Sequence, residues 1–223
     1  MTLRLDVRPA VRARSSLRLA IGGGLLSLAA CASDPPTRFH SLLPAEPARV
    51  SLPAGGASAQ QPSPGPIAIV LDPVRVPAQV DQPQWLVRLA DGSLQLLEQD
   101  RWAAPLRDEL HAALIEALAL RWGAVDGNSF SGAARPWRIT VDVARFESVL
   151  GREARLEVRW RIVAPTAGLP AAACVSVLRE SADSTLAIAQ AHQRIVVRLA
   201  DEIGATLQAL ARNAAARCPA SAG

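Results

Sequence analysis

Lysine and tyrosine are absent from the 223 residues, and cysteine and histidine occur only three times each. His40, His111 and His192 lie far apart and fit neither H-E-x-x-H nor a Cys/His ligand spacing, so the sequence predicts no metal site. Charged residues make up only 20% of the chain and hydrophobic residues 50%, which excludes wholesale disorder. At this length we expect one hydrophobic core, in one domain or at most two.

Sequence motifs of the common enzyme and nucleotide sites are also missing. The chain has no G-x-S-x-G, no Walker A motif and no G-x-G-x-x-G. Ser41 stands beside His40, but the segment shows no sharp turn of the kind that exposes a nucleophile. We therefore predict a protein that is not an enzyme, with no catalytic residues, no metal and no cofactor, and we expect a role in binding or assembly.

Excess positive charge is confined to the N-terminus. The formal net charge is +4, and the first 30 residues, with five arginines and one aspartate, hold all of it. From residue 31 onward, 19 arginines balance 19 acidic residues. A balanced chain of this kind lacks the basic surface that releases counterions from phosphates, so nucleic acid is not expected as a partner.

Residues 1–30 have the pattern of a signal peptide. An arginine-rich start precedes the apolar stretch Leu19–Ala30, whose 12 residues fall short of the roughly 20 that a spanning helix needs. The stretch ends in Leu28-Ala29-Ala30-Cys31, which resembles the bacterial lipobox. An ordinary secretory signal also ends in small residues, and the cysteine distinguishes the two. We predict that Cys31 carries acyl chains, palmitate among them, which anchor the mature protein to a membrane.

The predicted anchor also indicates a compartment. Ala32, and not aspartate, follows Cys31; by resemblance to enterobacterial sorting rules, this favours the outer membrane, with the protein facing the periplasm. Such a compartment is oxidising and leaves Cys174 and Cys218 as an even pair. Two interpretations stay open: a disulfide that ties the C-terminal tail to a strand, or two separate thiols in the core and in a frayed tail.

The mature chain begins with a tether and a proline-rich segment. A strand-like segment spans Thr37–Leu43, and residues 44–66 hold six prolines and read as an exposed loop. We divide the chain into a signal peptide at 1–30, a tether at 31–38, a folded domain at 39–218 that contains this loop, and a tail at 219–223. The tether is short, with a reach of at most about 25 Å.

Strands are predicted from apolar runs and alternation. Ile67–Leu71 reads as a buried strand, and the runs Trp85–Leu89 and Leu94–Leu97 flank an Asp-Gly turn typical of a hairpin. Trp137–Phe146 and Arg155–Val163 alternate with period two, which predicts antiparallel strands with one buried and one charged face. A last strand is expected at residues 174–178.

Two amphipathic helices complete the predicted fold. They span Pro105–Trp122 and residues 184–212, the second with Asp183 or Ser184 as its cap. We predict an α/β fold, a single-domain sandwich of a mixed, partly antiparallel sheet packed with two main helices. His192 falls on the apolar stripe of the second helix, where a core or interface histidine is favoured over a ligand or proton relay.

Short motifs in a fixed order relate the chain to a known family. They follow the lipobox and are Asp81-Gln82-Pro83-Gln84, Asp100-Arg101-Trp102-Ala103 with Pro105-Leu106, Val141-Asp142-Val143 with Arg145-Phe146-Glu147, and Ala191-His192 with Glu202-Ile203. In this order the chain resembles the ABC-type transport auxiliary lipoproteins of the PqiC/YmbA type. The resemblance covers nearly the whole mature chain and identifies residues 39–218 as the auxiliary lipoprotein domain.

The resemblance implies a subunit in lipid transport between the two membranes, with a part in envelope integrity. Such subunits work with MCE-domain proteins, in some systems with a permease and an ATPase, and associate with their own copies into rings. Partner contact or, alternatively, turn and helix-entry packing is then expected at Asp81, Gln84, Asp100, Arg101, Trp102 and His192. Two other functions stay open: a direct periplasmic lipid-binding carrier and an envelope hydrolase.

Overall fold

The computed structural model of the chain describes residues 35–44, 67–126, 135–166, 171–214 and 218–219. The predicted signal peptide, Cys31 and nearly all of the proline-rich segment lie outside these ranges. The chain divides into two units, Met1–Pro36 and Thr37–Gly223, and every helix and strand described below belongs to the second.

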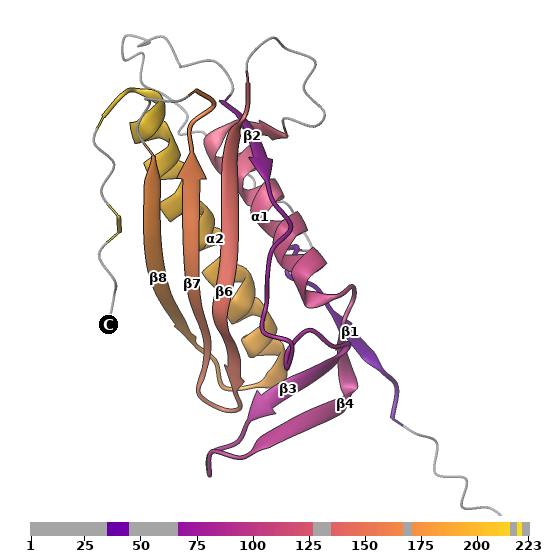
Figure 1. The fold of residues 1–223 in the computed structure, drawn as a ribbon. Helices are drawn as coiled ribbons and strands as arrows, with labels where there is room; N and C mark the ends of the chain where they lie inside the picture. The colour runs from indigo at the N-terminus through magenta and orange to yellow at the C-terminus, as the bar shows by residue number, and fades with distance from the viewer. Residues whose placement is uncertain (1–34, 45–66, 127–134, 167–170, 215–217, 220–223) are drawn as a thin grey trace, which may run out of the picture. The chain divides into compact units, whose positions relative to one another are not determined.

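Eight strands form one mixed sheet (Figure 1). In chain order they are β1 (Arg38–His40), β2 (Ile67–Leu71), β3 (Gln84–Arg88), β4 (Leu94–Trp102), β5 (Ala124–Asp126), β6 (Trp137–Val149), β7 (Glu153–Val163) and β8 (Ala172–Ser181). The sheet runs β1-β4-β3-β6-β2-β5, with β7 beside β6 and β8 beside β7. The pairs β3–β4, β6–β7 and β7–β8 are antiparallel and the other pairs are parallel. The predicted α/β fold with a mixed, partly antiparallel sheet is confirmed.

The long strand β6 organises this sheet. β7 pairs with it along one edge, while β2 and β3 share the other edge, β2 at its start and β3 at its end. A register shift between Val143 and Arg145 inserts one residue, so odd-numbered side chains point inward before it and Phe146 and Ser148 point inward after it. The bulge lets one amphipathic strand continue to Val149, past the predicted end at Phe146.

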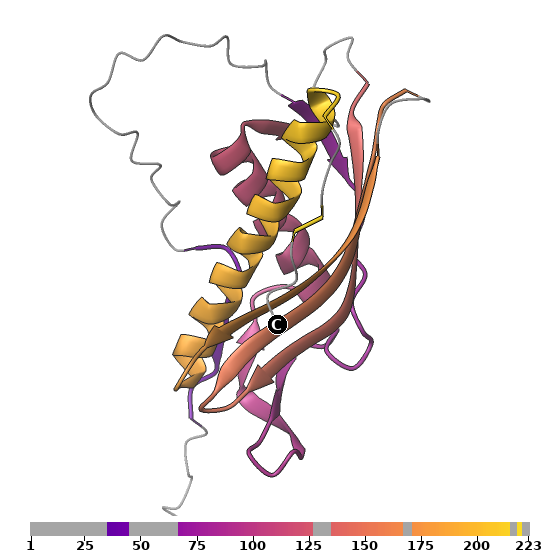
Figure 2. The same cartoon turned by 90° about the vertical axis from the view of Figure 1, so that its left-hand side faces the viewer.

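Helices α1 (Leu106–Trp122) and α2 (Thr185–Ala211) cover one face of the sheet (Figure 2). Pro105 precedes α1, and Gly123 ends it in the left-handed conformation at φ 63°. Ser184, and not Asp183, caps α2, because its side chain accepts a hydrogen bond from the Ala187 N–H. Within the described ranges, neither helix combines the length and apolar character needed to cross a bilayer.

The core lies between the helices and the inward face of the sheet. Strands β6 to β8 contribute alternate buried side chains, and the predicted apolar stripes of α1 and α2 pack against them. The opposite face of these strands carries arginine and acidic side chains. Cys174 on β8 and Cys218 form a disulfide, with their Cα atoms 5.4 Å apart, which fixes the described end of the chain to β8.

Where α1 and α2 cross, a glycine permits close contact. A Cβ atom added at Gly204 on α2 would lie only 2.4 Å from ring atoms of Trp122 on α1. The Trp122 indole N–H donates to Asp201 over 3.0 Å, and Arg121 binds both oxygens of the same carboxylate. Any larger residue at position 204 must therefore displace the indole or separate the helices.

We expect Gly204→Ala to lower the free energy of unfolding by about 1–3 kcal/mol, because overpacking outweighs the gain in helix propensity. In a Trp122→Ala background the same substitution should instead stabilise the protein, by up to about 1 kcal/mol. Urea denaturation of the four variants measures both effects. An equal effect of Gly204→Ala in the two backgrounds would show that the indole contact is not responsible.

Candidate functional site

Two of the predicted motif segments meet beside β1. The Trp102 N–H donates to the Pro83 carbonyl over 3.1 Å, and the Ala103 N–H donates to the His40 carbonyl over 2.8 Å. Gln84 on β3 pairs with Arg101 on β4. Because β1 is an edge strand, these segments form one end of the sheet. We call this region the β1–β4 corner; it consists of Phe39, Asp81, Gln82, Pro83, Arg101, Trp102, Ala103, Ala104, Pro105 and Arg107.

A buried carboxylate fastens β1 to β4 behind the corner. The parallel register sets Arg38 against Asp100 and His40 against Trp102. Asp100 is only 4% exposed and accepts hydrogen bonds from Arg38 Nη2 and His40 Nε2, each over 2.8 Å. Burial acts to raise the pKa of Asp100, but the hydrogen bonds from Arg38 and His40 outweigh it, so the pKa lies below its ordinary value. Asp100 is therefore held as an anion.

A row of rings leads from this carboxylate to α2. His40 stacks on Trp85 with centroids 4.5 Å apart, and Trp85 contacts Trp102 at 4.6 Å. Trp102 meets Phe146 edge-on at 5.8 Å, and Phe146 stacks on His192 at 4.0 Å. The row joins two predicted positions, Trp102 and His192, through a third predicted segment on β6. Ring contacts of this kind add stabilisation beyond the area that they bury.

His192 lies at the inner end of the row and is completely buried. Its Nε2 is 2.9 Å from Ser148 Oγ, and its Nδ1 has no hydrogen-bond partner among the described residues. Burial lowers the pKa of His192 from the ordinary 6.5 to about 3, so the ring is neutral near pH 7. A neutral imidazole without access to solvent acts here as part of the core.

The outer side of the corner is a hollow of about 330 Å³. Phe39, which pairs with Arg101, is 67% exposed at its rim. Asp81 Oδ2 is paired with Arg107 over 2.7 Å, which ties the hollow to the first turn of α1. Asp81 Oδ1 and Arg101 Nε are buried and, within the part of the chain described, have no hydrogen-bond partner. The hollow is therefore lined by charged side chains beside an apolar one.

Among the described residues, Ser41 has a structural role and is not placed as a nucleophile. Glu109 Oε2 accepts two hydrogen bonds, from Ser41 Oγ over 2.7 Å and from the Leu42 N–H over 2.8 Å. Glu109 belongs to α1 and is buried, so it anchors the chain that leaves β1. The neighbouring His40 is engaged by Asp100. No group of three metal-ligating side chains exists within the described ranges.

Several residues of the site were not predicted. The sequence predicted a strand-like segment at 37–43, but neither the pairing of Arg38, Phe39 and His40 with β4 nor the ion pair of Arg107. The available signal was the alternation of Arg38 and His40 on one face of a short strand. Their roles depend on pairing with residues more than 60 positions away, which no local pattern reveals.

Because the pKa of His192 is lowered in the folded protein, its contribution to stability is complete above pH 6.5 and is lost as the pH falls toward 3. At pH 5 this one group should cost the wild type about 2 kcal/mol of unfolding free energy relative to pH 7.5. His192→Gln cannot titrate and should lack this loss. Urea denaturation of both proteins at the two pH values provides the measurement, and the same pH dependence in both would contradict the assignment.

Solved structures share the fold of this chain. A crystal structure of an uncharacterized protein superposes with a TM-score of 0.58 at 14% sequence identity, over 78% of this chain and 99% of that one. A crystal structure of a protein from Xanthomonas campestris superposes with a TM-score of 0.52 at 21% identity, over 68% of this chain and 91% of the other. No curated protein matches the sequence.

A family model identifies the chain more specifically. The model of the ABC-type transport auxiliary lipoprotein component matches residues 51–204, which is more than half of the chain. The matched region includes the two segments of the β1–β4 corner and His192, and the resemblance predicted from the sequence is confirmed. This chain belongs to the family of ABC-type transport auxiliary lipoprotein components.

Proposed function

We propose that the chain is an outer-membrane lipoprotein that faces the periplasm and docks an MCE-type, ABC-linked lipid transport assembly there, without catalysing a reaction. Its family supports an auxiliary role with a transporter and attachment to a membrane through lipid. The observation that carries the finer proposal is the β1–β4 corner, where motif segments fold together close in sequence to the predicted lipid anchor.

Chain length limits how far the corner lies from the bilayer. β1 begins at Arg38, seven residues after Cys31. Even a fully extended chain of this length spans at most about 25 Å. If the acyl chains on Cys31 are in the outer membrane, the corner stays near its inner surface, where an assembly that crosses the periplasm must end. A docking surface is needed at that place.

The geometry divides the predicted positions between two roles. Asp100, Trp102 and His192 are buried and hold β1, β4 and α2 together. Asp81 and Arg101 are charged side chains that line the hollow, so these two are the proposed contacts for an MCE-domain protein. Gln84 pairs with Arg101 and supports it. Several copies in a ring would present this surface repeatedly to one assembly. In some systems this assembly also includes a permease and an ATPase.

The two alternative functions lack comparable support. A lipid carrier needs an apolar cavity, and sites for small molecules hold about 300–1,000 Å³. The apolar hollow between Leu42, α1 and α2 measures only about 30 Å³, while the larger hollows of about 330 and 500 Å³ are lined by charged side chains such as Arg107 and Arg159. An envelope hydrolase needs an activated nucleophile, whereas Ser41 donates to the carboxylate of Glu109 and not to a histidine. Both alternatives predict activities that the docking proposal does not, namely retained lipid and substrate turnover.

Cys31→Ser should abolish incorporation of radiolabelled palmitate and move the protein from the outer-membrane fraction to other fractions, because the thiol is the only proposed acyl acceptor. Cys218→Ser removes a cysteine outside the lipobox and is the matched control, which should remain labelled. Palmitate labelling with membrane fractionation tests both variants. Unchanged labelling and fractionation of Cys31→Ser would overturn the anchoring proposal.

Arg101→Ala should reduce crosslinking and co-purification with an MCE-domain protein about fivefold or more, as expected for an arginine at the centre of an interface. Its melting temperature should change little, because the guanidinium packs at the surface hollow. Arg135→Ala, at an exposed arginine before β6, is the control and should crosslink normally. A large loss of stability in Arg101→Ala would place this residue in the fold and remove it from the interface.

A further inference from the structure

β8 is an edge strand of the sheet and, among the residues that the structure describes, leaves some of its backbone groups unpaired. The Ala182 N–H, just after β8, donates to the carbonyl of Arg152, just before β7, over 2.9 Å. In an antiparallel pair, the N–H and C=O groups of every second residue point at the partner strand. In β8 these are the groups of the even-numbered residues, which point at β7. The N–H and C=O groups of Val175, Val177 and Arg179 therefore point away from the sheet.

Both ends of this edge are covered, and the middle is open. Cys218 Sγ lies 3.3 Å from the Ala173 carbonyl oxygen at one end. Arg198 Nη1 donates to the Arg179 carbonyl over 3.1 Å at the other end. Between them, the backbone groups of Val175 and Val177 have no partner in the described ranges of the chain. Two β-branched residues with free backbone groups form an edge that can accept another strand.

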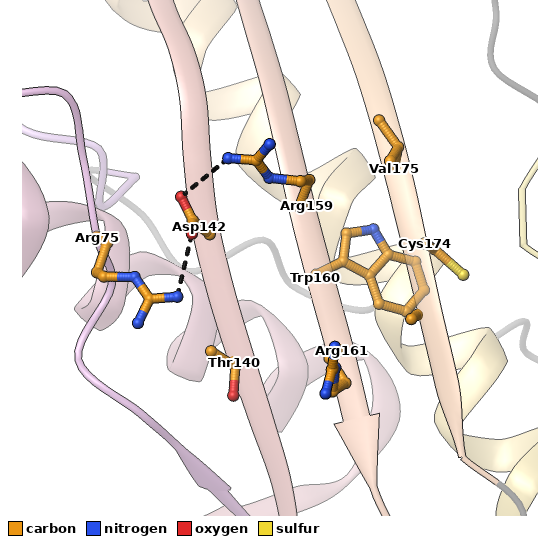
Figure 3. Close-up of a pocket in the computed structure, with 9 residues that line it drawn as sticks. Arg75, Thr140, Asp142, Arg159, Trp160, Arg161, Cys174 and Val175 are labelled. Atoms are coloured by element: carbon orange, nitrogen blue, oxygen red, sulfur yellow. Dashed lines mark hydrogen bonds and ion pairs between the residues drawn. The ribbon is translucent and has the colours of Figure 1, made fainter.

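The outer face beside this edge has an excess of positive charge. A hollow of about 500 Å³ on β6 to β8 is lined by Arg75, Arg159 and Arg161 and by a single carboxylate, Asp142. Arg75 binds Asp142 over 3.0 Å, while Arg159 approaches it only to 3.8 Å. Figure 3 shows both guanidinium groups directed at Asp142 and Arg161 apart from it. Asp142 thus leaves an excess of about two positive charges.

Register brings these arginines close to the open edge. On the outer face, Arg159 pairs with Val175 and Arg161 pairs with Ala173. Ala173 and Val175 are small, so they do not block the long side chains of Arg159 and Arg161 from reaching the edge. A further strand beside β8 would lie about 10 Å from β7, within reach of arginine and glutamate side chains together. Arg179 is exposed on the same face of β8 itself.

We propose that the open edge of β8 binds an extended acidic segment of a partner protein as an additional strand. The backbone of the segment would pair with Val175 and Val177, and its acidic side chains would bind Arg159, Arg161 and Arg179. The unpaired edge provides affinity through main-chain hydrogen bonds, and the excess of arginine favours a segment with negative charge. This surface is separate from the β1–β4 corner and does not depend on the docking proposal.

The free protein tests the first half of the proposal. In the full chain in nonionic detergent, amide hydrogen exchange should be fast at Val175 and Val177 and slow at Ser176 and Leu178, because only the even-numbered amides donate to β7. Equal protection at all four amides would show that the edge is already occupied, for example by the chain's own C-terminal residues, and would overturn the proposal.

A designed peptide tests the second half. A capped nine-residue peptide that alternates glutamate and valine should bind and slow exchange at Val175 and Val177 at least tenfold at saturation. The same peptide with lysine for glutamate should bind at least tenfold more weakly. Arg161→Ala and Arg179→Ala should each weaken binding of the acidic peptide about threefold, as expected for exposed ion pairs. Raising the salt concentration should weaken it further.

Two controls distinguish edge pairing from unspecific attraction. Arg138→Ala removes an arginine from the same face on β6, where it is paired with Asp72, and should leave peptide binding unchanged. Vesicles of anionic lipid should not slow exchange at Val175 and Val177. Equal losses in Arg138→Ala and Arg161→Ala, or protection of the edge by vesicles but not by the peptide, would overturn the proposal.

Discussion

The burial of Asp100 is the constraint on which the β1–β4 corner depends. A carboxylate that is 4% exposed is costly unless it is paired, because without a partner its charge stays buried and uncompensated. Arg38 and His40 supply the partners, and both belong to a strand of only three residues. β1 is too short to be stable through its backbone ladder alone, so this ion pair and the ring of His40 on Trp85 hold it in place.

The ring row extends this constraint through the domain. Each ring belongs to a different part of the chain, from β1 through β3 and β4 to β6 and α2. A change at β1 therefore disturbs the packing around His192, although the two lie about 150 residues apart in sequence. The exposed Phe39 and the half-buried Arg101 lie on the opposite side of the same strands. Their positions are as well defined as the buried rings that support them, which is what a docking surface requires.

Local patterns explain what could be predicted from the sequence. Alternation located β6 and β7, the Asp-Gly turn located the β3–β4 hairpin, and the apolar stripes located both helices, because each depends on neighbouring residues. The three-residue strand β5 was missed because it is too short to show a period. The extension of β6 to Val149 was missed because the bulge reverses the alternation at Ala144. The parallel pairing of β1 with β4 is encoded only in contacts across 62 residues, such as that of Arg38 with Asp100.

The arrangement of the charges also depends on the fold. From residue 31 onward the charges of the chain balance, which predicts no general attraction to phosphates. A sum over the chain says nothing about where the charges lie, however, and folding separates them: acidic residues such as Asp100 and Glu109 are buried in ion pairs or hydrogen bonds, while Arg159, Arg161 and Arg179 gather near the edge of β8. β1 and β8 are opposite edges of one sheet. The proposed docking surface and the proposed strand-binding edge therefore lie apart, so that occupation of one would leave the other free.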